Sequence, residues 1–429
     1  MIFSNIGSDD IKIIKEFRKN KVLYVEVETI NRGCVCKRCG TFHTNIKEYR
    51  NRKIKHSMYS LEKTVILLRQ RRFICPKCGK THMEINPFSS ESNRISDKTI
   101  EVILKYLKRY NITFRAAGNY SNASVGEVIR LFDKYCKMER KEFTRVLCFD
   151  EIYFSRKRKK KYVLVIINFF NKNIVDVLRD RDKSTINSYL RKINLEERKR
   201  VEHVCIDMTA TYRDILKLCF PLATISVDSF HVVKYIQSYL DKVKKRILKR
   251  YENDKESEEY YLLKFKSELL TQTDILSDKF TKVKYRSHYK QDYSEYSLLI
   301  KMLNINPELK DAYELYHSYI RFNNTDYADP VKAMDDLEEI INQYKLSNVD
   351  EFIELSSTLD NWKNEIVNSF IKIDGKRISN GPIEGKNSLI KKILRLANGY
   401  TNFRRFRNRI MYSLNKDSTH TFKSSCSEL

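Results

Sequence analysis

The sequence predicts a multidomain protein in which a small cysteine-rich module and an all-helical segment precede an α/β domain with a large helical insertion. Three patterns support this fold class. Paired cysteines occur early in the chain, helical periodicity follows them, and from residue 144 apolar β-rich runs alternate with helices. A chain of 429 residues has room for several domains. We expect segments at residues 1–93, 94–142, 143–231, 232–370 and 371–429.

The first segment contains two Cys-x-x-Cys turns, "CKRCG" with Cys36 and Cys39 and "CPKCGK" with Cys75 and Cys78. Each turn presents two thiolates, and two such turns close a tetrahedral zinc site. Four thiolates leave no open coordination position, so we expect a structural zinc ion in a small ribbon. Cys34 is expected to pack nearby without binding the metal. The arginines of "RQRRF" (residues 69–73) either contact phosphates or form an ordinary solvated face.

The net charge of +27 indicates which kinds of molecule the protein binds. Such an excess favours nucleic acid or an anionic membrane surface. The membrane interpretation is weak, because no apolar run approaches the roughly 20 residues that a spanning helix needs. The first residues lack a basic-then-apolar signal pattern, and most of the ten cysteines are scattered, as in a reducing compartment. We therefore expect a cytoplasmic protein.

The second segment reads as three helices, at residues 96–110, 113–120 and 124–137. Ser124 and Glu127 form a capping-box pattern at the start of the last helix, which has an apolar stripe of Val125, Ile129 and Phe132. A helix, a turn and a capped helix are typical of a helix-turn-helix, whose second helix enters the major groove. A three-helix packing domain without a DNA role is the alternative. The expected DNA contacts here are Arg115, Ser124 and Arg130.

The third segment begins with three β-rich runs, "RVLCF", "YVLVIINFF" and "NIVDVL". A helical stretch then leads to "VEHVCI", and a further helix leads to "ATISV". This order predicts a mixed sheet covered by helices, as in ribonuclease-H-like folds. Residues 232–370 are highly charged and poor in Gly and Pro, which indicates a helical insertion rather than another α/β domain.

Two aspartates end apolar strands of this predicted sheet. Asp150 follows "RVLCF", and Asp207 follows "VEHVCI". Strand ends line the crevice where open sheets bind ligands, so neighbouring strands would bring both carboxylates to one ion. Mg²⁺ accepts a few carboxylates and keeps positions free for water and phosphate oxygens. A pair of such ions supports in-line displacement at phosphorus.

A third carboxylate is expected from "SNGPIEGKN", where Gly381 and Pro382 start a helix and Glu384 lies in its first turn. The expected buried stripe is Ile383, Ile390, Ile393, Leu394 and Ala397. The expected polar face is Glu384, Asn387, Ser388, Lys391 and Arg395. A glutamate at a helix start often has no catalytic role. The combination with Asp150 and Asp207 favours the catalytic interpretation.

Cations concentrate in two further places, a basic run at residues 156–161 and the C-terminal helices. We expect them to contact phosphates and to set register without reading sequence. The residues predicted to do so are Arg156, Lys157, Arg158, Lys159, Lys160, Lys161, Lys386, Lys391, Arg395, Arg404 and Arg405.

These motifs together resemble a DDE transposase of bacterial insertion sequences, the ISL3 family. The matching pieces run from the two cysteine turns through "FDEIYF", "CIDMTATYRD" and "VDSFHVVK" to "SNGPIEGKNSLIKKILRLANGYTNFRRFRNRI". The resemblance implies a zinc ribbon, a helix-turn-helix and a ribonuclease-H-like core with a helical insertion. It implies a metal-binding triad of Asp150, Asp207 and Glu384 with Mg²⁺ (or Mn²⁺). Asp228 and His231 would support the triad or position DNA, with plain structural hydrogen bonding as the alternative and Asp228 as the fallback for the second acid.

The expected function is a bacterial, nucleoid-associated transposase acting on double-stranded DNA. It would bind the terminal inverted repeats of its own element, cleave there and join the ends to target DNA. Joining two ends calls for a homodimer or a larger assembly. Two alternatives stay open: a catalytically inactive or domesticated zinc-ribbon regulator, and a ribonuclease-H-like nuclease without strand transfer.

Overall fold

The computed structural model describes residues 11–59, 62–90, 94–155 and 160–423. The chain forms two compact units. Unit 1 contains residues 1–141, 154–161 and 386–429, and unit 2 contains residues 142–153 and 162–385. The segment expected at 371–429 is thus shared between the units. In the described part of the chain, no helix has the length and apolar character required to cross a membrane.

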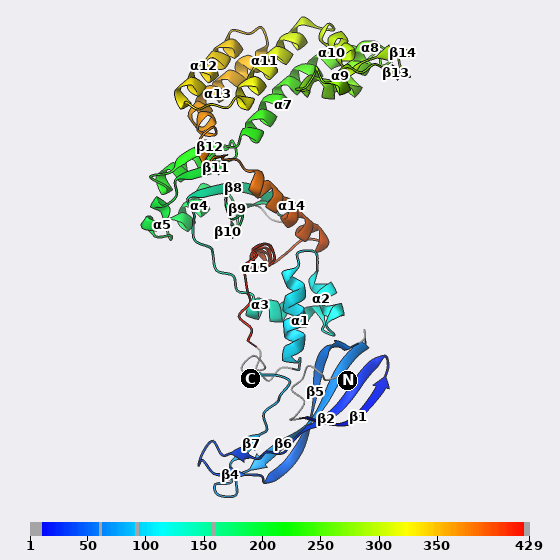
Figure 1. Ribbon diagram of the computed structural model, residues 1–429, viewed down its shortest axis with the longest axis vertical. Coiled ribbons are helices and arrows are strands. Elements are labelled where there is room, and N and C mark those ends of the chain that lie inside the picture. The colour runs from blue at the N-terminus through cyan, green and yellow to red at the C-terminus, as the bar shows by residue number, and fades with distance from the viewer. Residues whose placement is uncertain (1–10, 60–61, 91–93, 156–159, 424–429) are drawn as a thin grey trace. The chain divides into compact units, whose positions relative to one another are not determined.

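The N-terminal part of unit 1 is a five-stranded sheet with the order β1-β2-β6-β5 and with β7 paired to β6 (Figure 1). The pairing of β2 with β6 is parallel, and the other pairs are antiparallel. One face of the sheet buries an apolar cluster of Leu23, Val25, Val27, Ile54, Ile66, Leu68 and Phe88. The strands are β1 (Ile11–Lys19), β2 (Val22–Thr29), β5 (Ile46–Tyr59), β6 (Glu62–Ile74) and β7 (Thr81–Met83), with a small ladder of β3 (Cys34–Val35) and β4 (Phe42–His43) beside them.

Three helices follow in unit 1, as the sequence predicts: α1 (Asp97–Lys108), α2 (Phe114–Tyr120) and α3 (Val125–Tyr135). Ser124 caps α3 in a complete capping box with Glu127. The buried side of α3 is Val128, Leu131, Phe132 and Tyr135. The predicted stripe is confirmed at Phe132, whereas Ile129 is half-buried and Val125 is exposed because it is the first residue of the helix.

The C-terminal helix α15 (Phe403–Leu414) belongs to the same helical cluster. Tyr412 packs in its core, and the guanidinium of Arg409 is buried. Arg409 donates hydrogen bonds to the backbone carbonyls of Leu107, Arg109 and Ile112, the last two at 2.8 and 2.7 Å. These carbonyls lie at and beyond the end of α1, where no N–H group of the helix is available to donate to them. By supplying those hydrogen bonds, α15 stabilises the end of α1.

Unit 2 is built on a mixed sheet with the order β10-β9-β8-β11-β12. β9 is antiparallel to its neighbours β8 and β10, whereas β8, β11 and β12 run parallel. The strands are β8 (Val146–Tyr153), β9 (Tyr162–Asn168), β10 (Ile174–Leu178), β11 (His203–Ile206) and β12 (Thr224–Val227). The helices between them are α4 (Lys183–Leu190), α5 (Leu195–Lys199) and α6 (Ala210–Cys219). The chain therefore combines a cysteine cluster with a mixed α/β region, as predicted.

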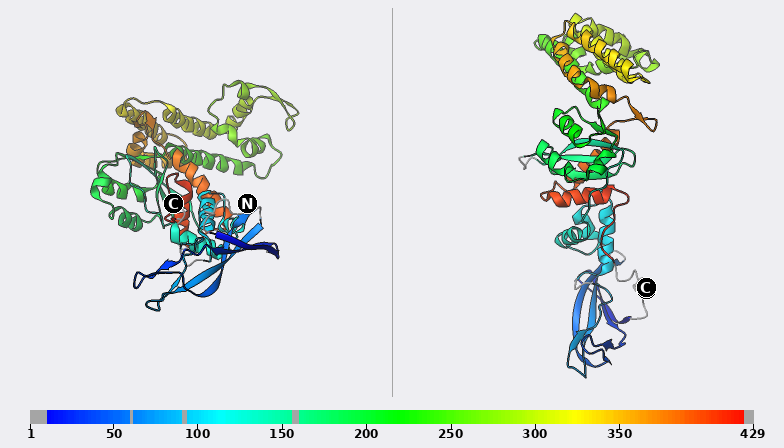
Figure 2. Two further views of the ribbon diagram at one scale, coloured as in Figure 1. Left: turned by 60° about the horizontal axis from the view of Figure 1, so that its bottom comes forward. Right: turned by 90° about the vertical axis from the view of Figure 1, so that its left-hand side faces the viewer.

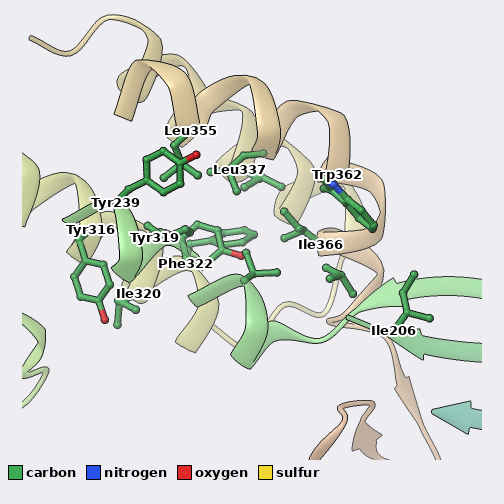
Figure 3. Close-up of a cluster of buried hydrophobic side chains, with 14 of the residues drawn as sticks. Ile206, Tyr239, Tyr316, Tyr319, Ile320, Phe322, Leu337, Leu355, Trp362 and Ile366 are labelled. Atoms are coloured by element: carbon green, nitrogen blue, oxygen red, sulfur yellow. The ribbon is translucent and has the colours of Figure 1, made fainter. Parts of the chain in front are cut away.

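The helical insertion grows out of the sheet through α7 (Ser229–Leu248). α7 and α11–α13 pack side by side (Figures 1 and 2). A single buried apolar cluster runs from Ile206 at the end of β11 to Trp362 on α13 (Figure 3), so the insertion shares the core of the sheet. Its remaining elements are η2 (Lys249–Tyr251), α8 (Glu258–Phe265), η3 (Ser267–Thr271), α9 (Asp278–Thr281), β13 (Lys284–Arg286), β14 (Gln291–Tyr293), α10 (Glu295–Leu303), α11 (Pro307–Asn324), α12 (Pro330–Lys345) and α13 (Asp350–Asn368). β15 (Lys372–Ile373), β16 (Lys376–Arg377) and α14 (Gly381–Leu396) follow.

A buried histidine makes unit 2 sensitive to acid. His203 is 1% exposed, and its Nε2 lies 2.7 Å from the Ser226 hydroxyl on the neighbouring strand. Burial lowers its pKa to about 4, because the charged imidazole is poorly solvated there. The unfolded chain, with a pKa near 6.5, therefore binds more protons between these two values. Stability contributed by neutral His203 is present above pH 6.5 and is lost as the pH falls toward 4, up to about 3 kcal/mol.

We expect the wild-type melting temperature of unit 2 to fall over that pH range, and the fall to be smaller in His203→Gln. Differential scanning calorimetry between pH 4 and 8 measures it. His288→Gln, at an exposed histidine, is the matched control and should lose stability toward acid to the same extent as the wild type. Equal acid sensitivity of all three proteins would contradict the assignment.

Candidate functional site

The four cysteines of the two Cys-x-x-Cys turns form one cluster. Their sulfur atoms all lie within 4.8 Å of one another, with Cys36 Sγ 3.5 Å from Cys78 Sγ and Cys39 Sγ 3.5 Å from Cys75 Sγ. A tetrahedron with Zn–S bonds of about 2.3 Å places its sulfurs about 3.8 Å apart, so the cluster fits a structural zinc ion.

The two cysteine turns have the same backbone geometry. In each, the first cysteine donates its N–H to a residue five positions on, Thr41 or Lys80, and accepts from a glycine four positions on. Gly40 and Gly79 have φ values of +70° and +69°, which favour glycine. Hydrogen bonding with the side chain and backbone of Thr41 lowers the pKa of the Cys39 thiol to about 6, which favours the thiolate that a metal binds.

Two histidines lie beside this cluster. His82 Nε2 lies 3.2 Å from Cys36 Sγ, and His43 Nε2 lies 3.4 Å from Cys34 Sγ. Cys34 thus packs beside the cluster without belonging to it. Sequence reasoning did not single out either histidine, although hydrogen bonds to thiolates commonly support such sites.

Three aspartates meet at one edge of the unit 2 sheet. Ile206 of β11 pairs with Phe149 of β8 and with Val227 of β12. Because the three strands are parallel neighbours, the residues that follow these three lie close together across the sheet. Those residues are Asp150, Asp207 and Asp228. The expectation that Asp150 ends its strand was wrong, because β8 continues to Tyr153 through its pairing with β9.

His231 links two of these carboxylates from the first turn of α7. Its Nδ1 lies 2.8 Å from Asp207 Oδ1 and 3.1 Å from Asp228 Oδ2. The two carboxylates raise the pKa of His231 to about 10. Burial and the neighbouring charge of Asp207 raise the pKa of Asp150 to about 7. Asp150 is therefore a carboxylate that is costly to ionise, and a bound cation would offset that cost.

Asn380 connects this cluster to the start of α14. It is fully buried, its side-chain amide donates to Asp207 Oδ1 at 2.9 Å, and its backbone N–H donates to Asp228 Oδ1 at 2.8 Å. Its carbonyl accepts from the N–H of Ile383 and of Glu384. Asn380 thus begins the helix while its side chain binds an aspartate instead of capping. Sequence reasoning missed this residue; an asparagine directly before Gly-Pro at a helix start was the available signal.

Glu384 lies in the first turn of α14 and is exposed. The buried stripe of this helix contains Ile383, Ile390 and Ile393 as predicted, whereas Leu394 and Ala397 are half-buried. The expectation that Asn387 lies on the polar face was wrong: it is 4% exposed, because its spacing places it between Ile383 and Ile390 on the buried face. Among the described residues, only the four cysteines bring three or more potential ligands within 4.8 Å of one another, so Asp150, Asp207 and Glu384 are less closely grouped than the cysteines.

The residues predicted to contact DNA differ in their surroundings. Arg115, Arg130, Lys160, Lys161, Lys391, Arg395 and Arg404 are exposed. The Ser124 hydroxyl is engaged in its capping box, Lys386 Nζ donates to the Leu414 carbonyl at 2.7 Å, and Arg405 is 2.6 Å from Asp133. Arg156, Lys157, Arg158 and Lys159 lie outside the described residues.

Comparison with known proteins gives consistent matches. Residues 147–410 match the family model of the ISL3 DDE transposases, and residues 32–78 match the zinc finger of the transposases of IS204, IS1001, IS1096 and IS1165. The transposase for insertion sequence element IS1001 of Bordetella parapertussis is 20% identical over 230 residues. The alignment covers 52% of this chain and 55% of that protein, so the chain spans about half the length of this relative.

Proposed function

Because this chain belongs to the ISL3 family of DDE transposases, we propose that it binds the terminal inverted repeats of an insertion sequence, cleaves DNA there and transfers the ends to target DNA. The observation that carries the proposal is that Asp150, within β8, and Asp207, after the end of β11, each come directly after the last residue pair of these two adjacent parallel strands. A mixed sheet with the order β10-β9-β8-β11-β12 supports a ribonuclease-H-like core.

Asp150, Asp207 and Glu384 are the residues that would hold Mg²⁺ or Mn²⁺. When bound, such ions activate the attacking oxygen and stabilise the leaving oxygen of an in-line displacement at phosphorus. Asp207 suits this role better than Asp228, because its side chain is 20% exposed whereas that of Asp228 is 2% exposed and contacts Asn380 and His231. His231 and Asn380 orient Asp207, and the backbone of Asn380 positions the first turn that carries Glu384.

DNA is the partner that the family and the charge support. We assign α2 and α3 as a helix-turn-helix, with Arg115 and Arg130 on exposed positions of those helices. Lys391, Arg395 and Arg404 offer further phosphate contacts. Two element ends must be held together for joining, so the proposed working form is a homodimer or a larger assembly on DNA.

The test is a strand-transfer assay with the full-length protein, Mg²⁺ and duplexes that carry the inverted repeats flanking its gene. We expect cleavage at the repeat ends and covalent joining of the new 3′ ends to a second duplex. Scrambled ends are the control. Cleavage without joining would favour a ribonuclease-H-like nuclease, and binding without cleavage would favour an inactive regulator.

A further inference from the structure

The N-terminal sheet has one apolar face and one open face. Strand pairing places the side chains of Phe17, Tyr24, Leu67 and Lys53 on the face opposite the buried cluster. We call this open side the basic face and define it by six residues. They are Lys15 and Phe17 on β1, Tyr24 on β2, Tyr49 and Lys53 on β5, and Arg69 on β6.

The aromatic rings of the basic face hold its cations. Phe17 and Tyr24 are stacked, with ring centroids 5.2 Å apart and an interplanar angle of 9°. Lys15 Nζ lies 5.6 Å from the centre of the Phe17 ring, and Lys53 Nζ lies 5.4 Å from the centre of the Tyr24 ring. The Arg69 guanidinium lies 4.0 Å from the centre of the Tyr49 ring. Each contact is in the range of a cation–π interaction, which orders a long side chain without neutralising it.

The charge of the basic face is largely uncompensated. Lys15, Lys53 and Arg69 are exposed, and Lys12, Lys19 and Lys63 are further exposed cations on the same side. The acids that β2 places on this side are Glu26, opposite Lys15 on β1, and Glu28, which lies 4.0 Å from Arg69 and 3.4 Å from Arg71. Arg71 is buried and bound to Glu84, and Arg72 is bound to Glu48, so Arg69 is the arginine of "RQRRF" best placed for a phosphate.

We propose that the basic face binds the sugar-phosphate backbone of duplex DNA, independently of sequence. Neighbouring strands lie about 4.8 Å apart, so cations from β1 to β5 extend over about 14 Å, comparable to the roughly 12 Å width of the major groove. A cationic side chain that an aromatic ring already orders loses less conformational entropy when it binds a phosphate. Phosphate binding is therefore more favourable on this surface than on a face whose cations are free in solvent. The inference rests on the proposed function only in taking DNA as the partner.

The test compares salt dependence of binding in two charge-matched variants of the full chain, without Mg²⁺ so that cleavage plays no part. One variant combines Lys15→Gln, Lys53→Gln and Arg69→Gln. The control combines Lys249→Gln, Arg250→Gln and Lys264→Gln, which are exposed residues of the insertion. The probes are a random-sequence duplex and a duplex carrying the element end, titrated between about 50 and 200 mM salt.

In the first variant, we expect the slope of the logarithm of the binding constant against the logarithm of the salt concentration to become shallower by about 2.7 on both duplexes. This is about 0.9 for each of the three phosphates that the variant no longer neutralises. In the control, the slope should stay unchanged. An unchanged slope in the first variant, or an equal change in the control, would overturn the proposal. Because binding is measured without cleavage, these outcomes do not depend on whether the chain transfers strands.

A second variant tests the role of the rings. Phe17→Leu with Tyr24→Leu keeps every charge and should leave the salt slope unchanged while weakening duplex binding about threefold to tenfold, because the rings no longer order Lys15 and Lys53. Zinc content and circular dichroism establish that the variant is folded. Tighter binding of the wild type to a single-stranded oligonucleotide than to the duplex, abolished when the rings are removed, would indicate base stacking and overturn the assignment to the duplex backbone.

Discussion

The variant Asp150→Asn should cleave DNA strands about a thousandfold more slowly, or worse, while it binds DNA as tightly as the wild type. The substitution keeps the size of the side chain and removes the charge that a divalent cation requires. Asp207→Asn should have the same effect on cleavage. Asp292→Asn, at an exposed aspartate of the insertion, is the matched control and should cleave normally.

Asp150→Asn should also make the metal-free protein more stable. Burial and the charge of Asp207 raise the pKa of Asp150 to about 7, so above that pH its ionised form destabilises the folded state relative to the unfolded one. A neutral asparagine removes this penalty, and the melting temperature at pH 8 should rise. Added Mg²⁺ should stabilise the wild type and not Asp150→Asn. Retained cleavage, or a fall in metal-free stability, would contradict the assigned role of Asp150.

Glu384→Gln separates the third ligand from the other two. Glu384 is exposed, so its substitution should not affect folding. We expect loss of cleavage with normal DNA binding and normal metal-free stability. Cleavage that survives in Glu384→Gln but not in Asp150→Asn would show that another group completes the metal site.

Local patterns were sufficient to predict the residues that meet at short range. Each cysteine turn contains its own glycine and hydrogen bonds, so its spacing alone predicts a pair of thiolates. Asp150 and Asp207 each follow a run of apolar strand residues, and the parallel pairing of β8 with β11 brings the two positions together, although β8 itself continues to Tyr153. These features depend on backbone geometry that a few residues determine.

Features that depend on distant parts of the chain were not predictable in this way. The N-terminal sheet needs the parallel pairing of β2 with β6, between residues about forty positions apart. Arg409 stood out only as one of many C-terminal cations, yet it is buried against the end of α1, some three hundred residues away. The contact of Asn380 with Asp207 likewise depends on where the insertion returns the chain. A sequence pattern gives the type of side chain at these positions but not its partner.

Loss of the cysteine cluster is the other change with a large expected effect. Cys36→Ser with Cys78→Ser leaves two sulfurs, and we expect the purified protein to lose its stoichiometric zinc. Structural zinc contributes on the order of 10 kcal/mol to folding in zinc-finger peptides. The short ladder of β3 and β4 contributes no residue to the apolar cluster of the sheet, whose members on the described strands lie on β2, β5 and β6, with Phe88 beside them. The metal therefore replaces a core at this end of the sheet.

Unfolding in that double variant should be local. Limited proteolysis should cut near the two cysteine turns, while the helical cluster around Phe132 and Tyr412 stays resistant, because its core contains none of the four cysteines. Cys34→Ser is the matched control. Its sulfur lies beside His43 and outside the cluster, so that variant should keep its zinc. Full zinc content in the double variant would refute the site, and zinc loss in Cys34→Ser would show that the metal is bound by a different set of sulfurs.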